Sequence, residues 1–303
     1  MQGFKDFDPA KDIPDLSGKV VLVTGGTEGL GEGCIRAFTA HNPLHIYFTG
    51  RNASTADALI SEIKLSHPTT SLTFIKMDLS SLRTVKEGIA EGFRHDRLDI
   101  LMNNAGIIAK PAILSTDGYE IQFTTNHLGH AMPTKELLPI LLRTAQHPGS
   151  DVRVITNTSE GYMFHRFVEG GISFSELDAG STMSRAVLGS WIRYGQSKFA
   201  NILFASELAR RYPALTSVVI HPGLNKTFVS VTSRMSGTKW LQAHEGILNQ
   251  LWCAAGAKKG ELRNGGFYMP VGVNCTDQLT IEAKDGVLAE RLWEWAGKVL
   301  SKY

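Results

Sequence analysis

The chain has 303 residues, of which 43% are hydrophobic and 20% are charged, and its formal net charge at pH 7 is +2. This composition supplies enough apolar side chains for a large core and too little charge for a disordered chain. A small net charge without a clustered block of lysines and arginines argues against nucleic acid as the main partner.

Three cysteines, Cys34, Cys253 and Cys275, are scattered along the chain without C-x-x-C spacing. They predict neither a disulfide framework nor a zinc ribbon, and they fit a reducing compartment. Residues 1–18 carry no apolar segment typical of a signal peptide, and no apolar run reaches the ~20 residues that a spanning helix needs. We therefore expect a cytoplasmic protein without a membrane span, with an amino-terminal arm at 1–18 and a single domain at 19–303.

The first predicted unit is a strand at 19–24, a glycine-rich turn and a helix that continues through 33–40. Further strands are predicted at 44–49, 71–77, 98–102, 151–157, 216–220 and 266–270, and helices at 54–66, 81–93, 117–143, 194–212, 241–256 and 285–302. Strands that alternate with helices predict an α/β fold, a Rossmann-type doubly wound domain with a central parallel sheet and helices on both faces. In such sheets, ligands bind beyond the carboxyl ends of the strands.

The glycine-rich turn has the pattern Thr24-Gly25-x-x-x-Gly29-x-Gly31, directly after a buried strand. Glycines permit a sharp turn, and they leave no Cβ to keep a diphosphate from the backbone N–H groups and the positive end of the helix. The turn therefore predicts a dinucleotide as ligand.

Arg51 ends the second predicted strand, where this architecture presents a side chain to the adenosine ribose. A guanidinium binds a 2′-phosphate and a carboxylate would repel it, so Arg51 favours NADP(H) over NAD. The alternative is a solvated charge at a strand end. Asp78 follows the third strand, where it could accept a hydrogen bond from the adenine amino group, cap the helix that begins near Ser80, or do both.

Tyr194 and Lys198 are spaced i and i+4, on one face of a helix that Tyr194 is predicted to open. A positive charge about 4 Å from a phenol, in an effective dielectric of about 20, is worth roughly 4 kcal/mol, or about three pKa units. Lys198 would thus bring the phenol toward neutrality. Ser159 ends a strand and could hold a substrate oxygen beside Tyr194, or it is an ordinary turn serine. Asn126 is polar within an apolar helical pattern, where it could bend the helix or anchor a water.

Metal binding is not expected. His127 and His130 are spaced i and i+3 without an acidic or cysteine partner, which is more typical of a helix face than of a metal site. His244-Glu245 lacks the second histidine of a zinc protease motif, because position 248 is leucine.

Together these motifs resemble the short-chain dehydrogenase/reductase family over roughly residues 17–280. The glycine turn, Asp78-Leu79, Asn103-Asn-Ala-Gly106, Asn126, Ser159, Tyr194-x-x-x-Lys198 and His221-Pro-Gly223 occur in the family's order and approximate spacing. The amino-acid sequence around Ser159 and Tyr194 looks most like the branch of the family that contains retinol dehydrogenases and WW-domain oxidoreductases.

The resemblance implies that Tyr194 is the general acid and base, that Lys198 lowers its pKa and binds the nicotinamide ribose, that Ser159 binds the substrate oxygen, and that Asn126 anchors a proton-relay water. Thr227 would contact the carboxamide. The expected cofactor-binding residues are Thr24, Gly25, Thr27, Gly29, Leu30, Gly31, Arg51, Asp78, Leu79, Asn104, Ala105, Gly106, Tyr194, Lys198, Pro222, Gly223 and Thr227. Glu28 occupies a position of the glycine turn where many NADP-dependent members have a small or basic residue.

Substrate choice is expected to reside in the loops at about 160–193 and 224–240, which are rich in large apolar side chains such as those of Gly161–Phe167 and Trp240. They could wall a pocket for a bulky carbonyl compound, or pack as ordinary covering loops. The leading hypothesis is an NADP(H)-dependent carbonyl reductase or alcohol dehydrogenase. The alternatives are a cofactor-binding sensor or scaffold without turnover, and an isomerase or dehydratase of the same family. A homodimer through the helices at 117–143 and 194–212 is expected.

Overall fold

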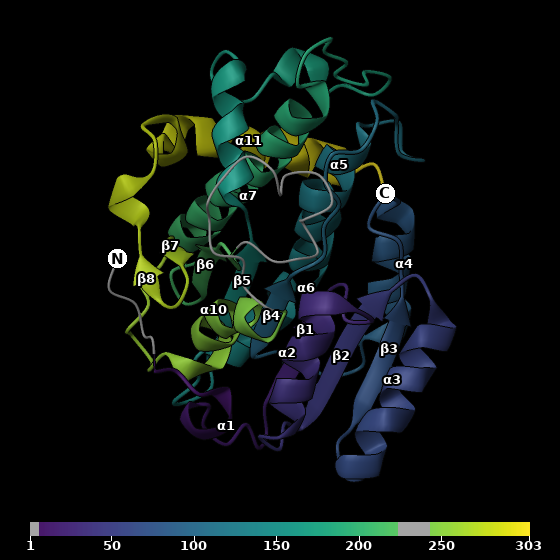
Figure 1. Cartoon of the computed structure of the whole chain (residues 1–303), viewed down its shortest axis with the longest axis vertical. Helices are drawn as coiled ribbons and strands as arrows, with labels where there is room; N and C mark the ends of the chain where they lie inside the picture. Colours follow the sequence, from purple (N-terminus) through teal and green to yellow (C-terminus); the bar gives the residue numbers. More distant parts are fainter. Residues whose placement is uncertain (1–5, 224–242) are drawn as a thin grey trace.

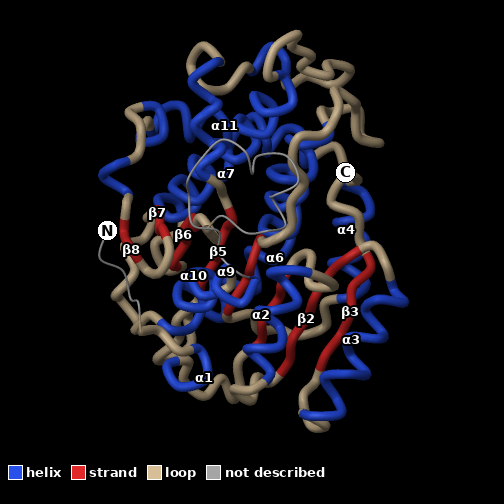
Figure 2. Tube along the Cα trace, viewed as in Figure 1, coloured by secondary structure: helices blue, strands red, loops and turns tan. Residues whose placement is uncertain are grey.

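The computed structural model describes residues 6–223 and 243–303. These residues form one eight-stranded sheet in the order β3-β2-β1-β4-β5-β6-β7-β8 (Figures 1 and 2). The strands are β1 (Val20–Val23), β2 (His45–Gly50), β3 (Leu72–Lys76), β4 (Ile100–Asn103), β5 (Arg153–Asn157), β6 (Thr216–Ile220), β7 (Phe267–Met269) and β8 (Val273–Asn274). Strands β1 to β7 pair in parallel, which confirms the predicted doubly wound α/β fold. The unpredicted β8 is an antiparallel edge strand, and its two residues are too few to show a sequence period.

Side chains that alternate along β1 enter two separate cores, one on each face of the sheet. Val20 and Leu22 point into a core shared with α4 (Leu82–Gly92), α6 (Gly129–Ala145), α7 (Gly189–Arg211) and α11 (Gly286–Leu300). Val21 and Val23 point into a core shared with α2 (Gly29–Thr39), α3 (Ala53–Ser66) and α10 (Leu248–Leu251). Because both faces are covered, every residue of β1 is buried, which explains its continuous apolar sequence.

Several helices differ from their predicted bounds. The helix expected at 117–143 is α5 (Ile121–Phe123), a π-helical turn (Thr124–Leu128) and α6 in succession. Helix α7 begins at Gly189, so the prediction that Tyr194 opens this helix is wrong by five residues. Its start carries no side-chain cap, and the preceding Leu188 has a positive φ of 53°, so the sequence offers no usual start signal. The expected helix at 241–256 is divided into α9 (Ala243–Gly246), α10 and a π-helical turn (Trp252–Gly256).

The remaining helices are short. They are α1 (Pro9–Asp12) and 3-10 helices at Glu160–Phe167, Phe174–Glu176, Thr276–Gln278 and Glu282–Lys284. Ile13 and Leu16 are buried in the core on the α2 side, so this part of the amino-terminal segment packs against the sheet domain.

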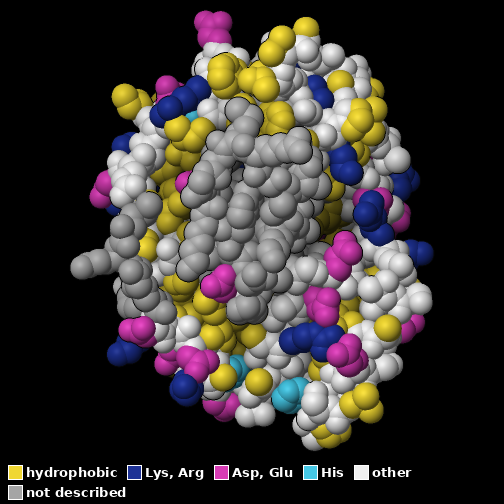
Figure 3. All heavy atoms as spheres, viewed as in Figure 1, with side chains coloured by type: hydrophobic (Ala, Val, Ile, Leu, Met, Phe, Trp, Pro, Cys, Tyr) yellow, Lys and Arg dark blue, Asp and Glu magenta, His cyan; other side chains and the backbone are white. Residues whose placement is uncertain are grey.

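The hydropathy of the helices and the distribution of surface charge bear on the expected partners. Within residues 6–223 and 243–303, none of the helices combines the length and the hydropathy that a bilayer crossing requires. On the face shown in Figure 3, acidic and basic side chains are interspersed.

Candidate active site

A cavity of about 550 Å³ lies at the carboxyl ends of strands β1 to β6. The expected cofactor-binding residues that line it are Gly25, Thr27, Gly29, Leu30, Arg51, Asp78, Leu79, Asn104, Ala105, Gly106, Tyr194, Lys198 and Pro222. Thr24, Gly31 and Gly223 are buried and do not line it. Thr227 and the expected substrate loop at 224–240 lie outside the described residues.

The glycine turn has the geometry that close approach of a diphosphate requires. Gly25 and Gly29 have φ values of 64° and 62°, in the left-handed region that favours glycine. A Cβ at Gly31 would lie 2.2 Å from the carbonyl oxygen of Gly25, so no larger residue fits there. Glu28 precedes α2 without making a side-chain cap hydrogen bond, which leaves the N–H groups of the first helical turn available to an anion.

Thr24 supports the site from below rather than lining it. Its hydroxyl oxygen accepts hydrogen bonds from the backbone N–H groups of Asn104 at 2.9 Å and Ala105 at 3.1 Å. The same hydroxyl lies 2.9 Å from Nε2 of His130, a buried side chain. Thr24 therefore fixes the loop after β4 to the end of β1, and His130 is part of this support rather than a residue of an exposed helix face.

Tyr194 and Lys198 both face the cavity from α7. Nζ of Lys198 lies 5.9 Å from the centroid of the Tyr194 ring and donates to the carbonyl oxygen of Asn157 at 3.2 Å. Burial lowers the pKa of Lys198 to about 8. Burial also raises the pKa of Tyr194 above its usual value, and Ser159 opposes this rise. The prediction that Lys198 brings the phenol toward neutrality is therefore wrong for the protein alone, because desolvation of the phenolate dominates.

Ser159 follows β5 and is held beside Tyr194 by the 3-10 helix that begins there. Its Oγ accepts a hydrogen bond from the N–H of Gly161 at 3.1 Å. A Cβ at Gly161 would lie 2.7 Å from Cε1 of Tyr194 and 3.4 Å from Oγ of Ser159. Only glycine therefore lets this helix approach the phenol ring so closely. Gly161 is not among the predicted site residues. The one signal in the sequence is that it lies two residues after Ser159.

The Tyr194 hydroxyl is buried and makes no hydrogen bond to a described residue. A buried polar atom without a partner is costly, so this oxygen is poised to bond a ligand.

Asn126 lies in the π-helical turn between α5 and α6. Its Oδ1 accepts from the N–H of Ile107 at 2.8 Å, and its Nδ2 donates to the carbonyl of Ile107 at 3.0 Å and to Oγ of Ser197 at 2.9 Å. Its own carbonyl oxygen accepts from Nδ2 of Asn201 at 3.0 Å. The side chain thus ties the loop after β4 to α7, and the predicted role in anchoring a water stays a prediction.

Part of the cavity lining is apolar. Ile107, Ile108, Ile113 and Ile121 belong to it, and the hydroxyl-bearing Thr125 lines the cavity as well. The Thr125 hydroxyl is buried and has no hydrogen-bond partner in the described part of the chain.

Aromatic rings extend from Tyr194 to the surface. The centroids of the Tyr194 and Trp191 rings are 6.3 Å apart, those of Trp191 and Phe164 are 5.8 Å apart, and those of Phe164 and Phe167 are 6.0 Å apart. Phe167 at the outer end is 63% exposed. These rings place apolar side chains of 161–167 beside Tyr194, but this segment contributes none of the described residues that line the cavity, so its role as a substrate wall stays a prediction.

Of the lining residues that follow β2 and β3, Arg51 is exposed and Asp78 is partly buried. Oδ1 of Asp78 accepts from the N–H and the hydroxyl of Ser80 at 2.9 and 2.8 Å. The carboxylate that bonds the first N–H of α4 belongs to Asp117, which lies 2.6 Å from the nitrogen of Leu82. Asp78 therefore shapes the turn before α4, while Asp117, 35 positions beyond Leu82, caps the helix.

Within the described ranges, no three His, Cys, Asp or Glu side chains are grouped as a metal ion would require. Nδ1 of His127 lies 3.2 Å from Oδ1 of Asn201, and burial lowers the pKa of His127 to about 4. Both histidines of this helix are thus neutral structural residues.

Comparisons with known proteins identify the family of the chain. A family model described as short chain dehydrogenase matches residues 19–167. The short-chain dehydrogenase/reductase drtF of Aspergillus calidoustus is 34% identical, with 96% of each chain covered. The WW domain-containing oxidoreductase of Gallus gallus is 32% identical, over 94% of this chain and 69% of the relative.

Solved structures show the same fold. A crystal structure of an uncharacterized protein from Mycobacterium paratuberculosis superposes with a TM-score of 0.75 at 28% identity, covering 99% of this chain and 98% of the other. A blue fluorescent protein from a metagenomic library, solved in complex with NADPH, has a TM-score of 0.63 at 22% identity, with 85% and 98% covered. The chain belongs to the short-chain dehydrogenase/reductase family of oxidoreductases.

Proposed function

We propose that the protein is an NADP(H)-dependent oxidoreductase that interconverts a carbonyl group and a secondary alcohol on a bulky hydrophobic small molecule. The observation that carries this proposal is that one cavity of about 550 Å³ joins the glycine turn, Arg51, Lys198 and Tyr194, whose hydroxyl bonds none of the described residues. Cofactor and substrate would meet at the phenol.

The residues of the cavity fit a phosphorylated dinucleotide. The diphosphate would lie against the glycine turn and the first turn of α2, where N–H groups are free and a Cβ at Gly31 would collide with the backbone. Arg51 would bind the 2′-phosphate, and Lys198 would bind the nicotinamide ribose. When bound, NADP(H) would supply or accept the hydride.

The protein's own residues would handle the proton and the substrate oxygen. In the reductive direction, the Tyr194 hydroxyl donates its proton to the carbonyl oxygen as negative charge develops there, and the Ser159 hydroxyl donates a hydrogen bond to the same oxygen. Lys198, charged below its pKa of about 8, stabilises the phenolate that remains. General acid catalysis of this kind is typically worth about 10²- to 10⁴-fold in rate.

The apolar part of the lining supports a large hydrophobic substrate. Four isoleucines line the cavity, and the rings of Trp191 and Phe164 extend outward from the ring of Tyr194, which lines it. Apolar walls with a few placed hydroxyl groups are typical of sites for hydrophobic small molecules.

The test is NADPH oxidation with a panel of aromatic and alicyclic ketones, quinones and short aliphatic ketones. We expect turnover of bulky members and little turnover of acetone-sized ones. The proposal is contradicted if NADPH binds and no member of the panel is reduced, or if the small ketones are the better substrates.

A further inference from the structure

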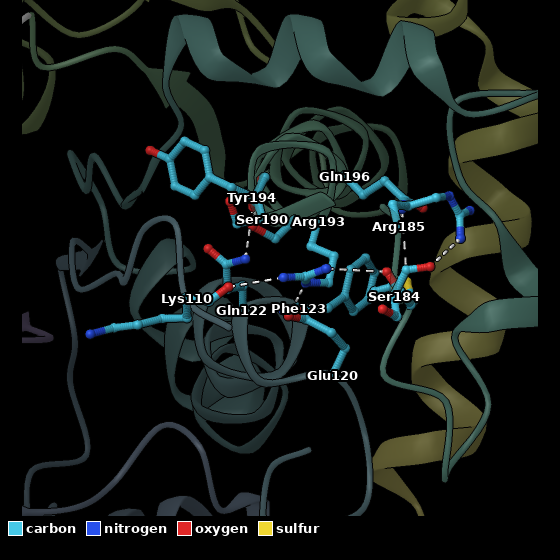
Figure 4. Close-up of polar contacts among 12 residues, drawn as sticks. Lys110, Glu120, Gln122, Phe123, Ser184, Arg185, Ser190, Arg193, Tyr194 and Gln196 are labelled. Atoms are coloured by element: carbon cyan, nitrogen blue, oxygen red, sulfur yellow. Dashed lines mark hydrogen bonds and ion pairs between the residues drawn. The ribbon is translucent and has the colours of Figure 1, made fainter. Parts of the chain in front are cut away.

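A buried ion pair includes Arg193, the residue that precedes Tyr194 in the chain. Arg193 and Glu120 are 3% and 2% exposed, and Nε of Arg193 lies 3.2 Å from Oε1 of Glu120 (Figure 4). Oε2 of Glu120 accepts a hydrogen bond from the N–H of Phe123 at 2.7 Å, which caps α5. The pair therefore joins the start of α5 to α7 at the residue that precedes the phenol.

The rest of the Arg193 guanidinium binds two other segments. Nη2 donates to the carbonyl oxygen of Lys110 at 3.0 Å, in the loop after β4. Nη1 donates to the carbonyl oxygen of Met183 at 3.3 Å, in the segment before α7. One side chain thus contacts the loop after β4, the start of α5 and the segment before α7, and Figure 4 shows its contacts with Lys110 and Glu120.

A second contact joins the same elements. The side-chain amide nitrogen Nε2 of Gln122 donates to the carbonyl oxygen of Ser190 at 3.0 Å (Figure 4). Because Gln122 lies in α5 and Ser190 in the first turn of α7, this bond and the ion pair together fix how α5 sits on α7.

Three of the cavity's wall residues adjoin this pair. Lys110 is itself bonded to Arg193, Ile121 follows Glu120, and Tyr194 follows Arg193, and all three line the cavity. The N–H of Ile121 also donates to the carbonyl oxygen of Ile113 at 3.1 Å, which extends the connection along the same wall. A shift of the guanidinium would therefore change the distance between the phenol and the apolar wall.

We propose that Arg193, paired with Glu120, is a positioning residue that fixes the substrate-binding wall formed by residues 107–121 at its distance from Tyr194. The proposal rests on the proposed function of Tyr194 as proton donor. Arg193 acts on substrate binding and alignment through the backbone, while the glycine turn and Arg51, which bind the cofactor, are independent of it.

The chemistry of arginine suits this role. Its planar guanidinium forms an ion pair with a carboxylate and donates hydrogen bonds to two carbonyl oxygens at the same time. The single ammonium of lysine cannot make all three contacts with the same geometry. Burial of the pair also means that removal of one partner leaves an uncompensated charge in the protein, so a charge-balanced variant is the informative one.

The experiment compares Arg193→Lys and the double variant Arg193→Met/Glu120→Gln with Arg153→Met as the matched control. Arg153 is 5% exposed, pairs with Asp151 at 2.6 Å and donates to two backbone carbonyls, but it lies at the amino end of β5, away from the cavity. All variants are tested as the full chain by circular dichroism, by NADPH titration and by kinetics with the substrate found for the parent protein.

We expect the double variant to lose about 10- to 100-fold in kcat/KM, mostly as a higher KM, because a misplacement of about 1 Å has effects of this size. Its Kd for NADPH should stay within about twofold of the parent value. Arg193→Lys should recover part of the loss, and Arg153→Met should lower the melting temperature without changing KM. Parental kinetics in the double variant, or an equal rise in KM in Arg153→Met, would overturn the proposal.

Amide hydrogen exchange gives a readout that does not depend on turnover. The double variant should exchange faster at residues 113–123 than the parent protein, and Arg153→Met should not. Unchanged exchange in this segment would overturn the positioning role whatever the kinetics show. Faster exchange in a protein whose parent form reduces no carbonyl compound would leave the positioning role standing and refute the proposed function alone.

Discussion

Replacement of Lys198 by methionine should make the cofactor-free protein more stable and less active. Burial lowers the pKa of this lysine from 10.5 to about 8, so the folded state binds its proton more weakly than the unfolded chain does. At about 1.4 kcal/mol for each tenfold change in proton affinity, the buried charge costs about 3 kcal/mol at pH 7. Loss of the hydrogen bond from Nζ to the carbonyl oxygen of Asn157 destabilises the variant by about 1 kcal/mol, which offsets part of this gain. Lys198→Met should therefore gain about 2 kcal/mol at pH 7.

The sign of the pH dependence follows from the same shift. Between the folded and unfolded pKa values, about 8 and 10.5, the unfolded chain binds more protons, so the stability of the parent protein rises with pH in this window. The difference in the free energy of unfolding between Lys198→Met and the parent protein should therefore decrease with pH and be close to zero at pH 9.5. His130 and His221, whose pKa values are lowered by burial and by Lys198, are neutral at pH 7 and above in both proteins and do not contribute.

Urea unfolding at pH 7 and at pH 9.5 measures both differences. The control is Lys258→Met, a change at an exposed lysine, which should alter the free energy of unfolding by less than about 0.5 kcal/mol. NADPH binding and turnover of Lys198→Met should both be weakened. A variant less stable than the parent at pH 7, or a stability difference that does not change with pH, would refute the electrostatic reasoning.

Three further predictions concern the same cavity. Tyr194→Phe should lower kcat by at least about 100-fold in steady-state assays while leaving NADPH binding nearly unchanged, and it should not destabilise the fold, because the hydroxyl it removes is buried without a partner among the described residues. Near-parental turnover would place the acid elsewhere. Arg51→Asp should erase or invert a preference for NADPH over NADH measured by fluorescence titration, and equal affinities in the parent protein would contradict the role of Arg51. Gly161→Ala should reduce kcat about tenfold or more, because its Cβ would lie 2.7 Å from the Tyr194 ring, whereas Gly297→Ala, where nothing lies within 4 Å, should leave kcat unchanged.

The seven parallel strands were predictable because they are short runs rich in apolar and β-branched residues, whereas the two-residue edge strand β8 was not. β1, for example, consists of four buried valine and leucine residues followed by the glycine turn, and both its place and its parallel pairing follow from the alternation of strands with helices. The cavity lining was predictable for a related reason. Residues that directly follow parallel strands meet at one edge of the sheet, which brought Arg51, Asp78, Asn104 and Pro222 to the same cavity.

Contacts between distant segments could not be predicted in this way. Arg193 and Glu120 are charged residues 73 positions apart, and in sequence each looks like a solvated charge, yet the fold buries them against each other. Asp117 caps α4 from a loop that follows β4. The pKa of Tyr194 differs in direction from the prediction because the spacing of Tyr194 and Lys198 reveals a nearby charge but not the burial of the phenol, which raises its pKa.

The π-helical turn at Thr124–Leu128 has a consequence for changes in chain length. Each residue of an α-helix rotates the chain by about 100°, so the wider turn sets the angular phase of α6 relative to α5. Removal of one residue here would keep nearly the same composition and helical content, but it would turn the buried face of α6 by about a quarter of a circle away from the sheet. Single-residue deletions should therefore destabilise the fold far more in this turn than in the surface connection at 146–151, which does not set the rotation of one helix relative to another.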